Sequence, residues 1–293
     1  MTAPETALNQ KALPQMDWPE PLSAREWDQR FPGIFDTAAF IAGPANVILQ
    51  LARMQIGYGV MESRVESGSV MKHPVKRSRT TFTYLAVAML GTPEEKLAYR
   101  REVNRAHAQV NSTAQSPVKY NAFDPELQLW VAACIAWGFV DANSRMQGEY
   151  SAEKRAEFYR LAEPLATTLQ VRPGMWPADL EAFEQYFEAG LEQVHIDDNV
   201  RAYLMRLVDL KILPPALRGL GRFHRFVTTG FLPPRLREEM HLDWDDARQK
   251  RFDRFLRVLG LVSRSIPRVV RQAPYLMLMW DVRRRMRRGL PMV

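Results

Sequence analysis

His107 is the residue whose type and position suggest the most specific chemistry. Together with Tyr99, Val103, Ala106 and Val110 it recurs at spacings of three and four, so these side chains share one helix face. A histidine on such an apolar face is most often a core residue whose ring bonds a carbonyl or carboxylate. A buried neutral imidazole is also what a haem iron takes as its protein ligand, with the second ring nitrogen donating to a nearby acceptor. Spacing alone leaves both interpretations open.

A second pair of polar residues lies on an otherwise apolar helix face. Arg79 and Thr83 are four residues apart, and Ala86 and Leu90 continue the same face. A guanidinium turned towards the protein interior needs an anionic or hydrogen-bonding partner. The alternative is that Arg79 pairs with a carboxylate at the surface, while Thr83 bonds back to the carbonyl of Arg79.

Motifs of several other kinds of site do not occur in this sequence. It has no glycine-rich nucleotide loop, no serine nucleophile elbow and no His-Glu-x-x-His zinc helix. Its single cysteine, Cys134, excludes an intramolecular disulfide and a cysteine-only metal cluster. The five histidines are far apart in the chain: His73, His107, His195, His224 and His241. A cofactor bound through one axial histidine is compatible with all of this.

Helical signals run through most of the chain. Thr92-Pro93-Glu94-Glu95 predicts a helix start with a capping box, and Asp124-Pro125-Glu126 predicts another. Strand signals are sparse, so the predicted fold class is all-α, in a single globular helical domain. We expect helices over 44–54, 79–90, 93–111, 125–143, 151–169, 177–193, 197–211, 233–239 and 243–259, with a last segment after Pro274.

Composition and charge narrow the class of protein. The chain has 293 residues, of which 46% are hydrophobic and 25% charged, which excludes a disordered or low-complexity protein. We expect an irregular arm over 1–34, a helical domain over 35–270 and a basic extension over 271–293. Residues 201–293 hold 21 Lys and Arg against 8 Asp and Glu. This excess indicates either an anionic partner or a solvated helix face.

The distribution of apolar residues bears on localisation. The longest apolar run, 129–140, is shorter than the roughly 20 residues of a membrane-spanning helix. The first fifteen residues lack the apolar stretch of a secretory signal. We therefore expect a cytoplasmic protein. The apolar tract 273–280 and the arginines after it could rest on an anionic membrane surface, or could form a docked C-terminal helix.

Several segments match one family in their order and spacing. They are the Arg-Thr-x-x-x-Tyr segment at 79–84, Gly91-Thr92 followed by Glu95, the Val-x-x-x-His-x-x-Val segment at 103–110, and the Tyr-x-Ala-x-Asp-Pro element at 120–125 before Leu129-Trp130-Val131. Leu-Pro-Pro-Arg-Leu-Arg at 232–237 and Leu-x-Trp at 242–244 also fit. Over roughly residues 35–270 the chain resembles the MpaB and latex-clearing-protein (rubber oxygenase) family of haem-dependent oxygenases.

The resemblance implies a fold, a cofactor and a set of site residues. The family fold is all-helical and sandwiches a b-type haem between helices, in a globin-like manner. His107 would be the proximal ligand of the iron, and Arg79 and Thr83 would be catalytic residues on the distal side. Arg79, Thr80 and Tyr84 would bind the cofactor together with His107. Members activate O2 and oxidise apolar substrates, and the best understood cleave isoprenoid C=C bonds.

Some positions depart from the pattern of the family. Arg53-Met54 stands where many members have His-Pro, and Phe82 stands where rubber-cleaving members have a lysine. Those members also use a carboxylate as a proposed base. Glu62, Glu66 and Glu102 are candidates for it, and no motif selects one of them.

Three hypotheses about function follow. The one we favour is a haem b-dependent oxygenase that uses O2 to oxidise or cleave an apolar, unsaturated, isoprenoid-like small molecule. The second is a haem protein whose activity is peroxidase-like or limited to binding O2. The third is a non-enzymatic helical binding module that uses its basic C-terminal third. No helix-turn-helix or zinc-finger signature indicates a specific nucleic-acid partner.

Overall fold

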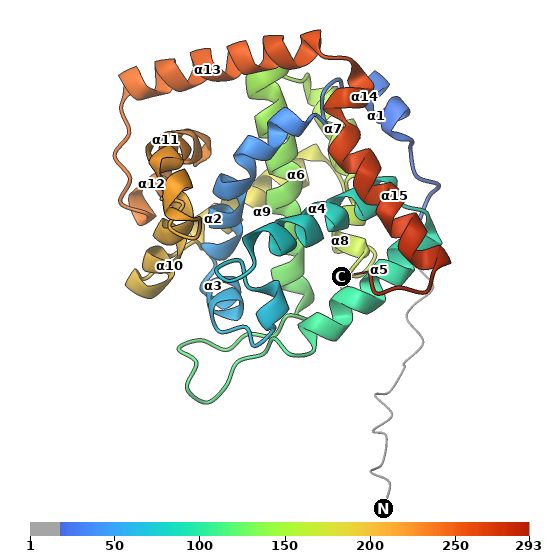
Figure 1. The fold of residues 1–293 in the computed structure, drawn as a ribbon, viewed down its shortest axis with the longest axis horizontal. Coiled ribbons are helices and arrows are strands. Elements are labelled where there is room, and N and C mark those ends of the chain that lie inside the picture. Colours follow the sequence, from blue (N-terminus) through green and yellow to red (C-terminus); the bar gives the residue numbers. More distant parts are fainter. Residues whose placement is uncertain (1–17, 293) are drawn as a thin grey trace, which may run out of the picture.

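A long buried helix runs through the middle of the molecule, and the other helices pack around it (Figure 1). This helix, α6 (Pro125–Gln147), begins where the Asp124 carboxylate accepts hydrogen bonds from the amides of Glu126 and Leu127, at 2.9 and 3.4 Å. It ends at Gly148, whose φ of 108° suits glycine. Buried side chains occur on every side of α6, because it meets neighbours all round.

The computed structural model describes residues 18–292. The segment examined for a secretory signal, and the first half of the expected arm, lie outside these residues. Helices and loops without a β-sheet make up the described part, which confirms the all-α prediction. Besides α6 they are α1 (Ala24–Arg30), η1 (Thr37–Ala42), α2 (Gly43–Leu51), α3 (Met54–Met61), η2 (Glu66–Gly68), α4 (Pro74–Leu90), α5 (Pro93–His107), α7 (Ala152–Leu161), α8 (Pro164–Thr167), α9 (Leu180–Glu192), α10 (Asp198–Val208), η3 (Pro215–Leu220), α11 (Gly221–Phe231), α12 (Pro234–Glu239), α13 (Asp246–Ser265), α14 (Arg268–Arg271) and α15 (Ala273–Arg287).

The described part of the expected N-terminal arm is helical and contributes to the core. Ser23 and Glu26 form a capping box that starts α1. Trp27 and Phe31 are buried, and the Trp27 indole donates to the Met89 carbonyl at 3.3 Å. The proline and aromatic content suggested a surface arm, but these aromatic side chains bury too much apolar area to stay in solvent.

The basic C-terminal segment, expected as an extension, packs on the helical domain. Its helix α15 crosses α4 on the right-hand side of Figure 1 and buries Tyr275, Met279 and Val282. No helix within residues 18–292 is both long enough and apolar enough to cross a bilayer.

Several helix predictions in the rest of the chain need correction. The helix expected over 79–90 begins at Pro74, and the helix expected over 151–169 is broken at Ala162 into α7 and α8. The helix expected over 44–54 ends at Leu51, since Arg53 is extended and starts the separate helix α3. Helix α11 was not predicted, because Thr228, Thr229 and Gly230 are poor helix formers. It forms because of packing: a Cβ at Gly230 would lie 2.4 Å from the ring of Phe252 in α13.

The contact between α13 and α6 depends on a glycine. A Cβ added at Gly260 would lie 2.0 Å from the backbone oxygen of Met146, so the two helix backbones are in direct contact. We expect Gly260→Ala to lower the free energy of unfolding by about 2 kcal/mol or more, measured by urea denaturation, because backbone cannot move aside as a side chain can. Gly43→Ala is the matched control, since no atom lies within 4 Å of its Cβ. Equal losses in both variants would contradict this packing.

Candidate functional site

His107 is the last residue of α5, and its ring is held without a hydrogen bond. Nδ1 is buried and has no partner in the described part of the chain. The ring meets Phe123 edge to face, with 6.2 Å between centroids. Burial, with a smaller contribution from the charge of Arg77, lowers the pKa of His107 to about 4. The imidazole is therefore neutral at physiological pH.

A chain of amides fixes the end of α5 that carries His107. The Gln170 side chain donates to Asn104 of α5 at 2.6 Å, and Gln128 of α6 donates to Gln170 at 2.6 Å. Gln128 also donates to the carbonyl of Ala122, in the loop that returns from α5, at 2.6 Å. At the other end the predicted capping box, Thr92 with Glu95, is present. Helix α5 is thus anchored at both ends.

Tyr99 joins α5 to α4, the helix with the other predicted site residues. Its side chain is fully buried and its hydroxyl donates to the carbonyl of Thr80 at 2.8 Å. Burial raises the pKa of Tyr99, against the opposing effects of Arg77, Arg79 and the Thr83 hydroxyl nearby. The ring of Tyr84 lies 6.4 Å from that of Tyr99. Thr80, Thr83 and Tyr84 are therefore gathered around one residue of α5.

The side chain of Arg79 is bound by α15. It is about half exposed and pairs with Asp281 of α15. The buried Thr83 donates its hydroxyl proton to the Arg79 carbonyl at 2.8 Å. Within residues 18–292 no hydrogen bond or ion pair joins either residue to His107.

The hydroxyls of Thr80 and Tyr84 also bond to the backbone. Thr80 donates to the Lys76 carbonyl at 3.0 Å, and Tyr84 donates to the Leu165 carbonyl of α8 at 2.6 Å. Burial raises the pKa of Tyr84. The Tyr84 bond fixes α4 against α8, whereas the Thr80 bond lies within α4, and each hydroxyl oxygen can still accept a further hydrogen bond.

Arg77 is a site residue that the sequence reasoning missed. Its side chain is exposed, yet protein surrounds it closely enough that desolvation lowers its pKa. Tyr99, Tyr203 of α10 and His107 are close enough to exchange electrostatic effects with it. A sequence signal for Arg77 does exist. It stands three residues before Thr80 and seven before Tyr84, and this spacing places the three side chains on one helix face.

The three candidate carboxylates have different partners. Glu62 accepts hydrogen bonds from the hydroxyls of Tyr120 and Ser116, at 2.7 and 2.5 Å. Glu66 pairs with Lys72 at 2.8 Å, and Glu102 pairs with Arg105. Glu62 differs from the other two because neutral hydroxyls, rather than a cation, bind its oxygens.

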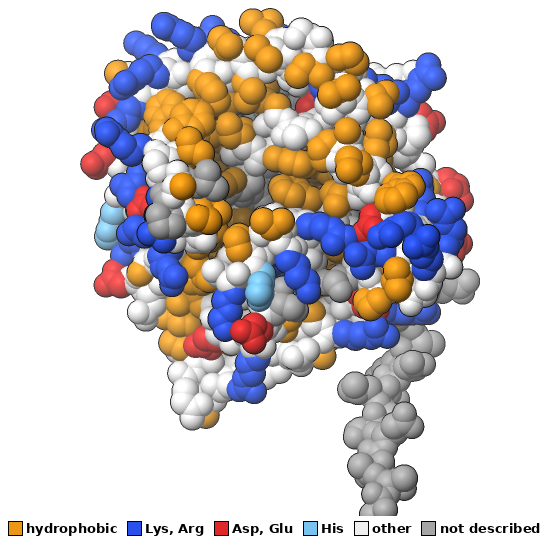
Figure 2. Space-filling model, viewed as in Figure 1, with side chains coloured by type: hydrophobic (Ala, Val, Ile, Leu, Met, Phe, Trp, Pro, Cys, Tyr) orange, Lys and Arg blue, Asp and Glu red, His pale blue; other side chains and the backbone are white. Residues whose placement is uncertain are grey.

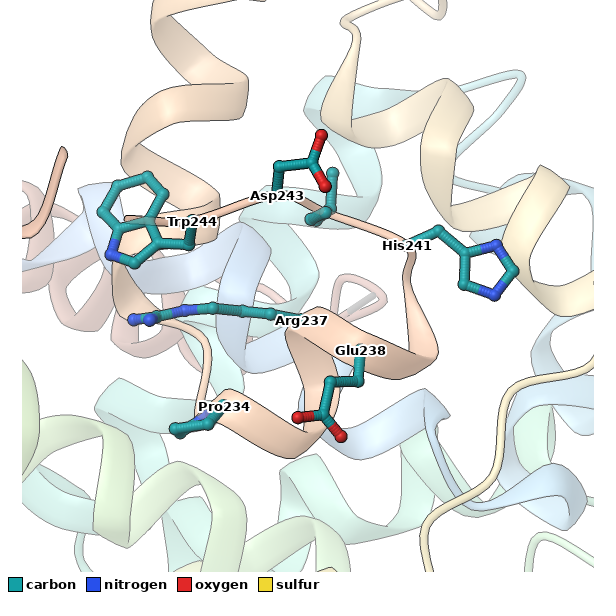
Figure 3. A pocket seen from close by; sticks show the side chains of 7 residues that line it. Pro234, Arg237, Glu238, His241, Asp243 and Trp244 are labelled. Atoms are coloured by element: carbon teal, nitrogen blue, oxygen red, sulfur yellow. The ribbon is translucent and has the colours of Figure 1, made fainter. Parts of the chain in front are cut away.

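An open surface pocket of about 300 Å³ lies at α12, away from these residues (Figure 3). Arg237 extends across it with its guanidinium carbon 5.0 Å from the centre of the Trp244 ring, and donates to the Thr229 carbonyl of α11 at 3.0 Å. The segments 232–237 and 242–244 thus form a corner that joins α11, α12 and α13. The lining residues are Pro234, Arg237, Glu238, His241, Leu242, Asp243 and Trp244, and none is a predicted site residue.

The helical fold and the matching sequence segments indicate an oxygenase of the all-helical class, and comparison with known proteins agrees. Residues 34–261 match the family described as "ER-bound oxygenase mpaB/B'/Rubber oxygenase, catalytic domain", and the chain belongs to this family of oxygenase catalytic domains. It is 49% identical over 246 residues to the uncharacterized proteins Rv2237 of Mycobacterium tuberculosis and Mb2261 of Mycobacterium bovis. Each match covers 84% of this chain and 96% of the relative. No solved structure matches the chain.

Asp281 provides a test of how α15 is held on α4. Burial would raise its pKa, but hydrogen bonds from Arg285 and Arg284 and the charge of Arg79 lower it from 3.8 to about 2. A carboxylate with a depressed pKa stabilises the fold above its unfolded pKa, and this contribution is lost as the pH falls from about 4 to about 2.

We expect Asp281→Asn to lower the free energy of unfolding by about 2 kcal/mol at pH 7. The difference from wild type should shrink as the pH falls below 4, measured by denaturant unfolding across pH. A difference that is absent at pH 7, or that stays constant down to pH 2, would contradict the ion-pair cluster.

Proposed function

We propose that the protein is a haem-dependent oxygenase whose His107 binds the iron of a b-type haem, and that it oxidises or cleaves an apolar, unsaturated, isoprenoid-like small molecule with O2. The observation that carries the proposal is the state of His107. Its ring is neutral, largely buried and without a hydrogen-bond partner at Nδ1, in a chain that belongs to an oxygenase family.

The residues around His107 fit the group. An iron ligand must be a neutral imidazole, and an imidazole with a pKa of about 4 meets this requirement throughout the physiological range. The described residues contain no group of three or more His, Cys, Asp or Glu that could hold a metal ion. A haem needs only one axial protein ligand, so a single histidine is sufficient.

Arg77 adds a charge that suits such a group. It forms no ion pair within residues 18–292, although nearby protein atoms desolvate it enough to lower its pKa. A partly desolvated cation without a carboxylate partner favours an anionic group of a bound molecule. The carboxylates of a haem have the charge that Arg77 would bind.

When bound, the haem would supply the redox chemistry that activates O2. Thr83 already donates its proton to the Arg79 carbonyl, so it would act on a bound molecule as an acceptor, or as a donor after rotation of its hydroxyl. Arg79 uses part of its donor set on Asp281 and has further N–H groups available. The polar groups near Tyr99 would therefore orient a reacting oxygen atom, while the apolar core would exclude water.

A second candidate is a haem protein of peroxidase-like or O2-binding activity only. The pairing of Arg79 with Asp281 favours it, since a guanidinium that faces a carboxylate contributes less positive charge to a site. Oxygen uptake with an isoprenoid probe such as squalene distinguishes the two: the oxygenase consumes O2, and the peroxidase-like protein requires added peroxide.

Replacement of His107 tests the axial ligand. We expect His107→Ala to lose most of its haem, measured as the haem-to-protein ratio by the pyridine haemochromogen method, because the iron loses its protein bond. His195→Ala is the control, since His195 is mostly exposed and pairs only with Glu239 at 3.4 Å. Full haem occupancy in His107→Ala, with a spectrum like that of the wild type, would overturn the assignment.

Replacement of Thr83 tests the distal side without a known substrate. We expect Thr83→Val to retain haem and to change the rate at which the dithionite-reduced protein reoxidises in air by about fivefold, the factor for one hydrogen bond of about 1 kcal/mol. Thr81→Val is a matched control on the same helix, because Thr81 also bonds back to the carbonyl four residues earlier, at 3.1 Å. Equal reoxidation rates in both variants would show that Thr83 does not act at the site. The reoxidation rate of Arg79→Ala is measured in the same way.

A further inference from the structure

Helix α15 exposes an apolar stripe, and the contact made there is the guanidinium of Arg284, which lies 5.4 Å from the centre of the Trp280 ring. Tyr275, Met279 and Val282 point into the protein. On the opposite side of the helix, Met277 and Trp280 are 67% and 60% exposed, and Leu276 beside them is 37% exposed. Exposure of a tryptophan to water costs free energy. Its side chain is better suited to an interface between an apolar phase and water.

Two other helices continue the stripe into a wider surface. Val258 and Val262 of α13 are each 53% exposed, and Phe223 of α11 is 49% exposed. Figure 2 shows hydrophobic side chains gathered on one face of the molecule over α11, α13 and α15, around a hollow. We call this surface the apolar face and define it by Phe223, Val258, Val262, Leu276, Met277 and Trp280.

Arginines surround the apolar face, and few acidic groups offset them. Residues 251–293 contain eleven Arg and only two acidic residues, Asp253 and Asp281. Asp281 is already paired with three arginines. Arg287 and Arg288, seven and eight residues beyond Trp280, form no ion pair within residues 18–292 and are exposed. The surface therefore combines an apolar centre with a net positive border (Figure 2).

Hydrogen bonds and an ion pair fix the helices of the apolar face to the rest of the protein. Asp36 is buried, and pairs with Arg271 of α14 while accepting a hydrogen bond from Ser263 of α13 at 2.8 Å. Thr37 donates to the Arg271 carbonyl at 2.6 Å. These contacts hold the junction of α13, α14 and α15 in place, so the exposed apolar side chains belong to a fixed surface.

We propose that the apolar face docks on a lipid bilayer that contains anionic lipids. Exposed tryptophan and aliphatic side chains would enter the interfacial region, and the bordering arginines would meet the headgroups. A second copy of the chain fits less well, because a symmetric contact would bring the same arginine border against itself. This inference concerns attachment to a membrane, and it does not depend on the haem or on the proposed reaction.

Co-sedimentation of the full-length protein with vesicles tests the proposal. We expect binding to phosphatidylcholine vesicles that contain phosphatidylglycerol, weaker binding to pure phosphatidylcholine, and a loss of binding as salt is added. The paired change Met277→Ser with Trp280→Ser should lower the partition coefficient about tenfold or more, since two apolar side chains no longer leave water. Arg287→Gln with Arg288→Gln should lower it about tenfold at low salt.

The matched control removes the same charge elsewhere. Arg160 of α7 and Arg172 are exposed and form no ion pair within the described residues, so Arg160→Gln with Arg172→Gln should bind as the wild type does. The proposal is overturned by failure of the wild type to bind either vesicle, or by equal losses in the control pair. It is also overturned if light scattering reveals a dimer that the serine variant dissociates, because a second copy then covers the apolar face. Circular dichroism melts establish that each variant is folded.

Discussion

A buried imidazole nitrogen without a hydrogen-bond partner is the feature on which the candidate site depends. Such a group costs free energy, because in water it would be solvated and here nothing replaces the lost contact. The protein holds it nonetheless, at the end of a helix that is capped at Thr92 and tied to α6 through Gln170. A ligand atom that bonds Nδ1 itself would recover this cost, whereas a metal bound through the other ring nitrogen would leave Nδ1 in need of an acceptor.

Helix α4 connects this site to the outer surface. One side of it meets α5 through Tyr99 and presents Arg77 towards His107. The other side presents Arg79 to Asp281, the carboxylate that also holds Arg284 and Arg285 of α15. Helix α4 thus contacts both α5, which carries His107, and α15, which carries part of the apolar face.

Local signals predicted the starts of the helices much better than their ends. The capping residues Thr92 and Asp124 act within one turn, and both helices begin where the sequence indicated. The break at Arg53 and the helix at 221–231 depend on contacts with distant segments, such as the packing of Gly230 on Phe252, which periodicity does not report.

The site was predicted only in part, because sequence patterns do not report contacts between distant segments. Helical spacing and family resemblance brought His107, Thr80, Thr83 and Tyr84 to attention, and the fold gathers the last three around Tyr99. Whether they act on a cofactor stays a prediction. Arg77 was missed, because the residues that act on it electrostatically belong to two other helices, α5 and α10. The partner of Arg79 is 202 residues away in the chain, and no local pattern reveals it.

The most direct test of the haem assignment is an absorption spectrum of the purified protein, first oxidised, then reduced with dithionite, then exposed to carbon monoxide. A haem bound through His107 with an open position predicts a Soret band that moves on reduction and moves again with carbon monoxide. A colourless protein that takes up no haemin on reconstitution would contradict the assignment and leave the neutral, unpartnered His107 without its proposed ligand.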